Sequence, residues 1–179
     1  MTDFEVPSSI DTKREKLDLA AEITGELRSN GYVIEEANLD KPWGAYLRLA
    51  NNDAEKFIAE FFPGLTLHEA QLGIEGAELS PKILIVAPSQ RLSWQYHDRR
   101  AERWRFLTEG GYYKSMTNDQ GKLIHASPGD VVQFATSERH RLVGADQTYT
   151  IVAEIWQHTV RELASNEDDI VRLADDYSR

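Results

Sequence analysis

The sequence predicts a mainly β domain, built as a sandwich, jelly roll or small barrel and preceded by helices. After Pro81 the chain divides into short segments rich in β-branched and aromatic residues, a composition typical of strands. Turn signals such as Asn118-Asp119 and Pro128-Gly129 separate the segments, and no long helical pattern interrupts them. Antiparallel pairing is therefore favoured over strand–helix–strand units. The predicted strands span residues 82–87, 91–97, 103–108, 111–116, 122–126, 130–135, 139–143 and 148–157.

Two helices are predicted before these strands. From residue 12 to 28 apolar residues recur close to the helical period, and Asn30-Gly31 supplies a stop signal. Residues 53–62 carry a second, shorter helical pattern, which Pro63-Gly64 ends. The acidic tail over residues 165–179 is expected to dock as a short helix or an extended arm.

Composition limits the classes of partner and the compartment. The 179 residues fit one domain, and the net charge of -10 provides no basic surface for nucleic acid or an anionic membrane. An anionic ligand must therefore be attracted by a local cluster of positive groups. The absence of cysteine excludes disulfides, thiolate zinc sites and cysteine nucleophiles. The N-terminal residues do not resemble a signal peptide, and no segment approaches the ~20 apolar residues that span a bilayer, so we expect a cytoplasmic protein.

Polar residues in the β region are spaced so that they could form one site. In a strand over residues 91–97, Gln95 and His97 project from the same face, because side chains alternate. If the faces that carry Glu102 and His140 turn into the same barrel, the four side chains converge. Two imidazoles, a carboxylate and an amide oxygen would suit one divalent metal ion, and zinc, iron, manganese and nickel remain open. The alternative is a set of ordinary barrel-lining polar residues with hydrogen-bond partners.

This spacing resembles the two cupin motifs, G-x5-[H/Q]-x-H-x4-E and G-x5-P-x-G-x2-H-x3-N. Ser89 stands in place of the first glycine, and the four ligand positions match. The second motif runs from Gly129 through His140 to Gly144, which stands in place of asparagine. Its P-x-G turn reads Ala-Thr-Ser at residues 135–137, so the loop geometry departs from the pattern.

Longer strings narrow the resemblance to the cupin domain of type II mannose-6-phosphate isomerases. They are KPWG at 41–44, RLSWQYHDRRAERW at 91–104, RHRL at 139–142 and EDDIVRLADDYSR at 167–179. The resemblance implies a cupin fold, a double-stranded β-helix or jelly-roll barrel, over residues 41–179. A helical insertion around 50–80 and an N-terminal helical extension over 1–40 complete a single structural domain. We expect it to stand alone, without the GDP-mannose pyrophosphorylase domain that often precedes it in that family.

The same resemblance implies a metal-dependent aldose–ketose isomerase of the mannose-6-phosphate/fructose-6-phosphate type. Arg100 is expected to bind the substrate phosphate, because a guanidinium fork matches a phosphate bidentately. The general base should be a carboxylate whose pKa burial brings toward neutrality. Glu102 fills that role only if the metal does not hold it tightly, and Glu154 is the open alternative. Trp104 shares a face with Glu102 and is expected in the core or stacked on the sugar ring.

Departures from the family strings favour a second interpretation. Asp98, Arg99 and Arg103 replace histidines that flank the ligands, so the chain is alternatively a non-catalytic cupin that binds a sugar or sugar nucleotide in polysaccharide synthesis. The expected partners are a phosphorylated sugar as substrate of the isomerase and, in either case, a second copy in a homodimer, because an isolated barrel leaves sheet edges open. Arg141 is expected to face outward. The remaining histidines, at 68, 125 and 158, are expected to be structural.

Overall fold

The computed structural model describes residues 15–179, and the first residues of the predicted helix, 12–14, lie outside that range. The helices are α1 (Lys16–Ser29), the short 3-10 helix η1 (Asn51–Asp53), α2 (Ala54–Phe61) and α3 (Leu67–Ala70). The first strands are β1 (Ile34–Asn38), β2 (Gly44–Leu49), β3 (Lys82–Val86), β4 (Trp94–Tyr96), β5 (Arg100–Phe106) and β6 (Gly110–Ser115). The others are β7 (Ile124–Ala126), β8 (Val131–Phe134), β9 (Arg139–Gly144), β10 (Thr150–His158) and β11 (Val171–Ala174).

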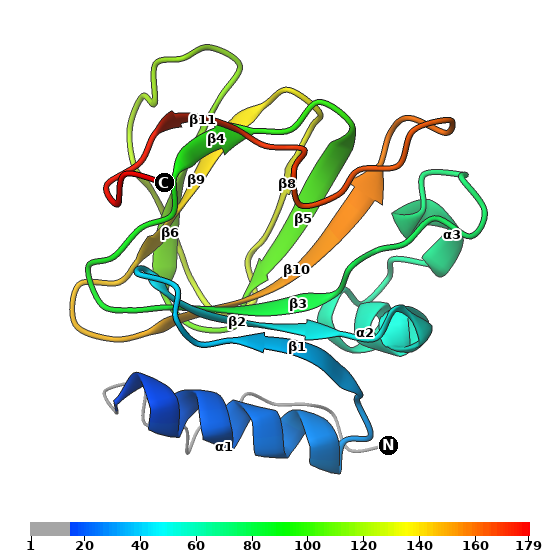
Figure 1. The fold of residues 1–179 in the computed structure, drawn as a ribbon, viewed down its shortest axis with the longest axis horizontal. Helices are drawn as coiled ribbons and strands as arrows, with labels where there is room; N and C mark the ends of the chain where they lie inside the picture. Colours follow the sequence, from blue (N-terminus) through cyan, green and yellow to red (C-terminus); the bar gives the residue numbers. More distant parts are fainter. Residues whose placement is uncertain (1–14) are drawn as a thin grey trace.

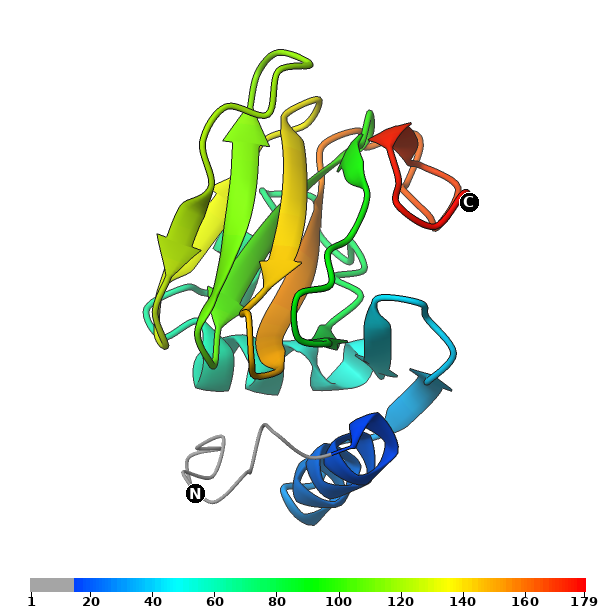
Figure 2. The same cartoon turned by 90° about the vertical axis from the view of Figure 1, so that its left-hand side faces the viewer.

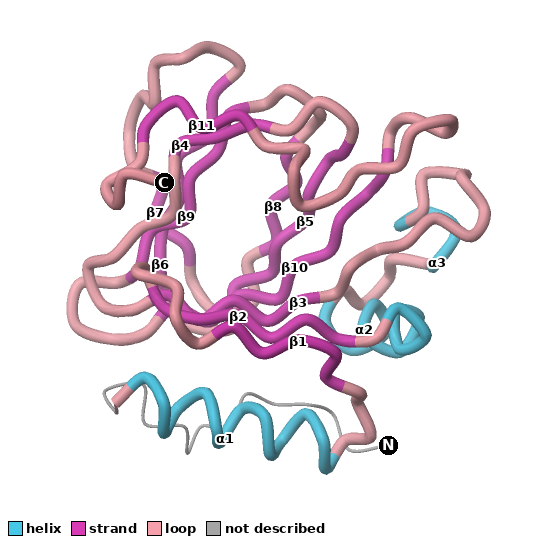
Figure 3. The backbone as a smooth tube through the Cα atoms, in the orientation of Figure 1, coloured by secondary structure: helices cyan, strands magenta, loops and turns pink. Residues whose placement is uncertain are grey.

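Two antiparallel sheets face each other and form a jelly-roll barrel (Figure 1). One has the strand order β1-β2-β3-β10-β5-β8, and the other has the order β11-β4-β9-β6-β7. Figure 3 shows that the helices lie outside the strands. The predicted fold class is therefore confirmed: a mainly β cupin-type fold with an N-terminal helix and a short helical insertion. Among the described residues, no helix is long and apolar enough to cross a membrane.

The central strands β3 and β10 of the six-stranded sheet are buried on both faces. On β3, Ile83 and Ile85 pack against the helices, whereas Leu84 and Val86 pack inside the barrel. This division follows from the alternation of side chains along a strand. It explains why all five residues of β3 are buried. On β10 the same alternation directs Glu154 toward the barrel interior, where it lines a cavity.

Helix α1 covers the outer face of this sheet (Figure 2). Its buried stripe comprises Leu19, Ala20, Ile23 and Leu27, as the helical period predicts. The helix ends where predicted: Gly31 has a positive φ of 78°, a conformation that glycine adopts without steric cost.

Several elements differ from the sequence prediction. β1 was not predicted, and it pairs with β2, so the segment before residue 41 adds a strand to the main sheet. The predicted strand 91–97 is interrupted, and only Trp94–Tyr96 is regular. Arg91 lies opposite Val143 while Gln95 lies opposite His140, so this strand holds one extra residue between the two pairs, as in a β-bulge.

The C-terminal segment adopts the extended alternative. β11 pairs with β4 and extends the five-stranded sheet (Figure 1). The 90° view shows the same segment lying beside β4 (Figure 2). This pairing brings the C-terminal segment next to the strand that carries Gln95 and leads into His97.

Candidate metal centre

Three predicted ligands meet inside the barrel. His97 lies in the turn after β4, Glu102 on β5 and His140 on β9, and all three side chains are buried. His97 Nε2 lies 3.0 Å from Glu102 Oε1, and His140 Nε2 lies 3.3 Å from Glu102 Oε2. One potential ligand atom from each residue lies within 4.8 Å of the other two. This group could therefore hold a metal ion.

The hydrogen bonds of the two imidazoles fix which nitrogen faces the carboxylate. His97 Nδ1 is 2.6 Å from the carbonyl oxygen of Asp169, and His140 Nδ1 is 2.9 Å from that of Glu138. A carbonyl oxygen only accepts, so each Nδ1 carries a proton, and in a neutral ring this leaves an Nε2 lone pair facing Glu102. His140 Nε2 is buried without a hydrogen-bond donor. Lone pairs and a carboxylate that converge in this way are stabilised by a cation between them, and the donor set fits a divalent metal.

Burial and charge favour these ligating forms. Burial, aided by the neighbouring Arg100 charge and opposed by Glu102, lowers the pKa of His97 and so favours the neutral imidazole that binds metals. Burial alone would raise the pKa of Glu102, but its interactions with His97, Arg100 and His140 hold that pKa well below its usual value. The carboxylate therefore stays ionised inside the barrel.

Gln95 lies close to this group without joining its network. It is the register neighbour of His140 across the β4–β9 pair and lines the same cavity. Its Oε1 accepts a hydrogen bond of 2.5 Å from Ser93 Oγ. Its role as a fourth ligand remains a prediction.

Arg100 is buried and extensively hydrogen-bonded. Its Nε donates to Glu102 Oε1 at 3.0 Å, and its Nη1 donates to Ser165 Oγ at 2.8 Å and to the carbonyl of Asn166 at 2.9 Å. Nη2 lies 3.3 Å from His97 Nε2, and the guanidinium carbon lies 3.8 Å from the centre of the Trp156 ring. Arg100 was expected to bind the substrate phosphate, but most of its N–H donors are bonded to other groups of the protein.

Glu154 is a second buried carboxylate in the cavity. Burial, reinforced by the charge of Glu102, raises its pKa to about 7. Its Oε2 accepts a hydrogen bond of 2.8 Å from Trp104 Nε1, and its Oε1 lies 3.9 Å from Lys82 Nζ. The two carboxylates of one cavity thus have pKa values displaced in opposite directions, a pattern typical of groups with different chemical roles.

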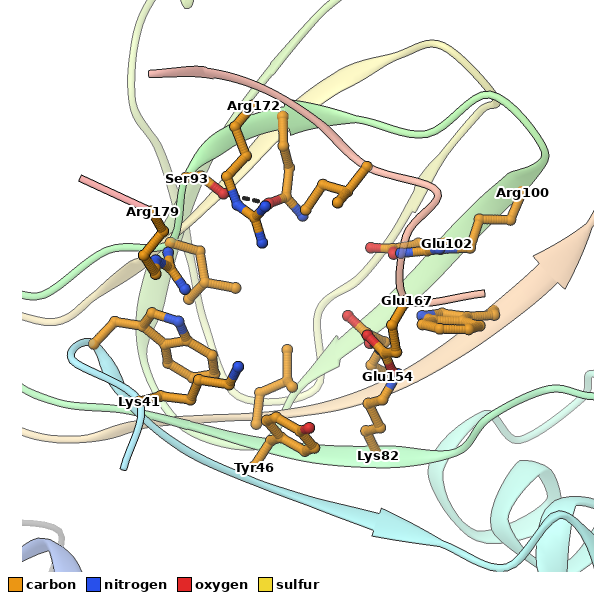
Figure 4. A pocket seen from close by; sticks show the side chains of 16 residues that line it. Lys41, Tyr46, Lys82, Ser93, Arg100, Glu102, Glu154, Glu167, Arg172 and Arg179 are labelled. Carbon is orange, nitrogen blue, oxygen red and sulfur yellow. Dashed lines mark hydrogen bonds and ion pairs between the residues drawn. The ribbon is translucent and has the colours of Figure 1, made fainter. Parts of the chain in front are cut away.

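The cavity itself has a volume of about 110 Å³. In Figure 4, Lys41, Arg172 and Arg179 extend into it from one side, opposite Arg100, Glu102 and Glu154. The sequence interpretation did not select Lys41 or Arg172 as site residues. Both lie in strings quoted for the family resemblance, KPWG and EDDIVRLADDYSR, so the signal was present in the sequence.

Trp104 lies behind the cavity and not on its wall. It is 1% exposed, and its ring packs edge-on against Phe134 and His140 with ring centres 4.4 Å and 5.5 Å apart. Aromatic rings at the cavity come from Trp43, Tyr46 and Trp156 instead. The sequence left open whether Trp104 lies in the core or stacks on the sugar ring, and in the structure it lies in the core.

Arg141 faces away from the barrel interior, as predicted, but it is not exposed to solvent. The side chain points away from His140, as strand alternation requires, but Nε donates to the Leu92 carbonyl at 2.6 Å and Nη2 to Asp176 at 3.0 Å. Its side chain is 2% exposed, because the C-terminal segment packs beside this face of β9.

Comparisons with known proteins support the fold alone. No family model and no curated protein sequence matches the chain. A crystal structure of the capsular polysaccharide assembling protein CapF from Staphylococcus aureus is similar, with a TM-score of 0.54 and 14% identity over 88% of this chain and 37% of CapF. A Cupin 2 conserved barrel domain protein from Salinispora arenicola has a TM-score of 0.46 and 18% identity over 69% of this chain and 82% of that one. The chain thus spans about a third of the length of CapF.

Proposed function

We propose that the chain is a metal-dependent aldose–ketose isomerase that acts on a phosphorylated sugar, such as mannose 6-phosphate or fructose 6-phosphate. The observation that carries this proposal is the pair of carboxylates in one cavity. Glu102 lies between two imidazoles that suit a metal, and Glu154 has a pKa of about 7. Proton transfer at a carbon next to a carbonyl needs a base of this kind beside an electrophile.

Glu154 is the base in this proposal. It removes the proton from C2 of the aldose and returns it to C1, while the hydroxyl proton on O2 moves to O1, so that the ketose has the same composition. Trp104 Nε1 holds the Glu154 carboxylate in place, and Lys82 favours its ionised form. His97, Glu102 and His140 would hold a divalent metal, which would supply the Lewis acidity that polarises the carbonyl and stabilises the enediolate.

Lys41 and Arg172 are proposed to bind the phosphate. Arg100 uses most of its donors on Glu102 and on the C-terminal segment, which makes it a support for Glu102. Arg179 also lines the cavity, but a bidentate ion pair with Asp175 compensates its charge. Lys41 and Arg172 form no ion pair with another described residue, so their charges are available to an anion in a chain whose net charge is -10.

The substituted family positions do not count against catalysis. Asp98 is exposed, Arg99 donates to the Ala164 carbonyl, and Arg103 donates to Gln133. None of the three lines the cavity. They therefore leave the cavity chemistry unchanged, which favours the isomerase over the non-catalytic alternative.

A coupled assay tests the proposal. Protein loaded in turn with zinc, iron, manganese or nickel should interconvert mannose 6-phosphate and fructose 6-phosphate. Glu154→Gln should abolish turnover, while Lys41→Ala and Arg172→Ala should each raise KM about tenfold, because each removes one charged hydrogen bond to phosphate. Lys122→Ala, at an exposed lysine outside the cavity, is the charge-matched control for Lys41→Ala.

Absence of turnover with every metal and with a panel of sugar phosphates would refute the isomerase. The remaining alternative would then be the non-catalytic, sugar-binding cupin of polysaccharide synthesis. In that case His97→Ala and His140→Ala would change only metal content or sugar affinity.

A further inference from the structure

Asp169, in the C-terminal segment, contacts the turn that carries His97. Its Oδ1 accepts a hydrogen bond from the backbone N–H of Asp98 at 2.9 Å, and its Oδ2 accepts one from that of Arg99 at 3.1 Å. Ser165 Oγ also donates to Oδ2, at 2.6 Å. The buried carboxylate of Asp169 therefore stabilises, through hydrogen bonds, the turn after β4, which lies about seventy positions earlier in the chain.

The backbone of the same residue fixes the ring of His97. The Asp169 carbonyl accepts the Nδ1–H of His97 at 2.6 Å and also lies 3.3 Å from Arg100 Nη1. A neutral imidazole with its proton on Nδ1 can present only Nε2 to a metal. If the carbonyl moved, the ring would lose the hydrogen bond that fixes its orientation and that favours the proton on Nδ1.

The strand ladder alone gives weak support to this arrangement. β11 joins β4 through the pairs Val171–Tyr96, Arg172–Gln95 and Ala174–Trp94, with a register shift after the second pair. The first pair lies next to His97 but does not include it. The carboxylate of Asp169 supplies the remaining attachment through its two oxygen atoms.

We propose that Asp169 is a positioning residue for the metal centre: it holds His97 in the orientation and tautomer in which Nε2 faces Glu102. Its carboxylate fixes the turn before β5, and its backbone carbonyl fixes the imidazole ring. The side chain and the backbone of one residue therefore both act on His97. This inference rests on the metal centre of the proposed function and not on the isomerase reaction. Removal of such outer hydrogen bonds typically weakens metal binding 10- to 100-fold.

The test compares Asp169→Asn with Asp168→Asn in the full chain. Both variants remove one negative charge at adjacent positions, but Asp168 is exposed. Calorimetric titration with Zn²⁺ or Co²⁺ should show affinity about 10- to 100-fold weaker for Asp169→Asn, and affinity within about twofold of wild type for Asp168→Asn. The visible spectrum of bound Co²⁺ should change in the first variant alone.

A metal-free measurement separates positioning from general damage. Long-range ¹H–¹⁵N NMR correlations should report a single Nδ1–H tautomer for His97 in the wild type and in Asp168→Asn. Asp169→Asn should add the Nε2–H form while leaving the ring of His140 unchanged. If Asp169→Asn does not fold, Ser165→Ala removes only the hydroxyl that joins Asp169 to Arg100, and about three- to tenfold weaker metal binding is expected.

The outcomes distinguish this inference from the isomerase proposal. Equal metal affinity and an equal His97 tautomer in the two asparagine variants would overturn the role of Asp169, whatever the enzyme activity. A wild-type chain that binds metal through a single His97 tautomer but turns over no sugar phosphate would refute the isomerase and leave Asp169 supported. A wild-type chain that binds none of the tested metals would overturn both.

Discussion

The raised pKa of Glu154 makes the stability of the protein depend on pH in a way that Glu154→Gln should remove. Below about pH 4.5 the side chain is neutral in the folded and unfolded chains alike. As the pH rises toward about 7, the unfolded chain ionises at this position while the folded chain stays protonated, because burial and Glu102 oppose the charge. The folded state therefore loses stability through this window, and the loss is complete above about pH 7.

The size of the effect follows from the two pKa values. The difference between about 7 and the ordinary value of 4.5, at about 1.4 kcal/mol for each pH unit, amounts to about 3 kcal/mol for a fully buried group. Glutamine keeps the shape and can accept the hydrogen bond from Trp104, but it carries no charge. Glu154→Gln should therefore match wild type near pH 4.5 and exceed it by about 3 kcal/mol at pH 8.

Urea unfolding of the metal-free proteins between pH 4.5 and 8 measures this difference directly. Trp104→Phe is a second probe, because it removes the hydrogen bond that favours the ionised carboxylate and should raise the pKa of Glu154 further. A bound divalent metal offsets the charge of Glu102, so the pH dependence should shrink when metal is added. A difference between Glu154→Gln and wild type that stays constant from pH 4.5 to 8 would refute both the raised pKa and the choice of Glu154 as base.

Three further substitutions, two of them with a matched control variant, test the centre and the barrel. His140→Ala should weaken Zn²⁺ binding more than about 100-fold in a calorimetric titration, while His125→Ala, at an exposed histidine on β7, should leave it unchanged. Phe134→Ala should lower the free energy of unfolding by about 3–5 kcal/mol in urea, because the ring is fully buried in the barrel core; a loss below about 1 kcal/mol would contradict that packing. Gly44→Ala should prevent folding, seen as loss of the near-ultraviolet circular dichroism, because its φ is +149° and a Cβ there would lie 1.9 Å from a β3 carbonyl oxygen. Gly64→Ala, also at positive φ but with open space around it, should cost only about 1–2 kcal/mol.

The strands of the C-terminal half were predictable because their signals are local. Short segments rich in β-branched and aromatic residues, separated by turn dipeptides, mark β3 and β5 through β10, and the structure confirms these elements within a few residues. β1 gave no such signal: its sequence, IEEAN, alternates between half-buried and exposed positions and contains two acids. Its place in the sheet depends on pairing with β2, which a reading of local pattern does not detect.

Only the part of the site that depends on residue spacing and on the alternation of side chains along strands could be predicted. Offsets along β5 and β9 place Glu102 and His140 on inward faces, and closure of the barrel brings them to His97. The contacts of Arg100 could not be predicted, since Ser165 and Asn166 lie more than sixty positions away and approach only when the tail docks. The homodimer and the cytoplasmic location stay predictions.

The two carboxylates illustrate how one cavity can give identical functional groups different roles. Glu102 lies beside two histidines and the Arg100 guanidinium, whose positive charge compensates that of the carboxylate, so Glu102 remains an acceptor for a cation. Glu154 has one hydrogen bond, from Trp104, and its nearest cation, Lys82, also faces Glu167 at 3.2 Å. The pKa of Glu102 is lowered and that of Glu154 is raised. A proton that enters the cavity near neutral pH therefore binds to Glu154 and not to Glu102. The arrangement thus supports the roles proposed above, with Glu102 as metal ligand and Glu154 as proton acceptor, and exchanging those roles would require moving Arg100.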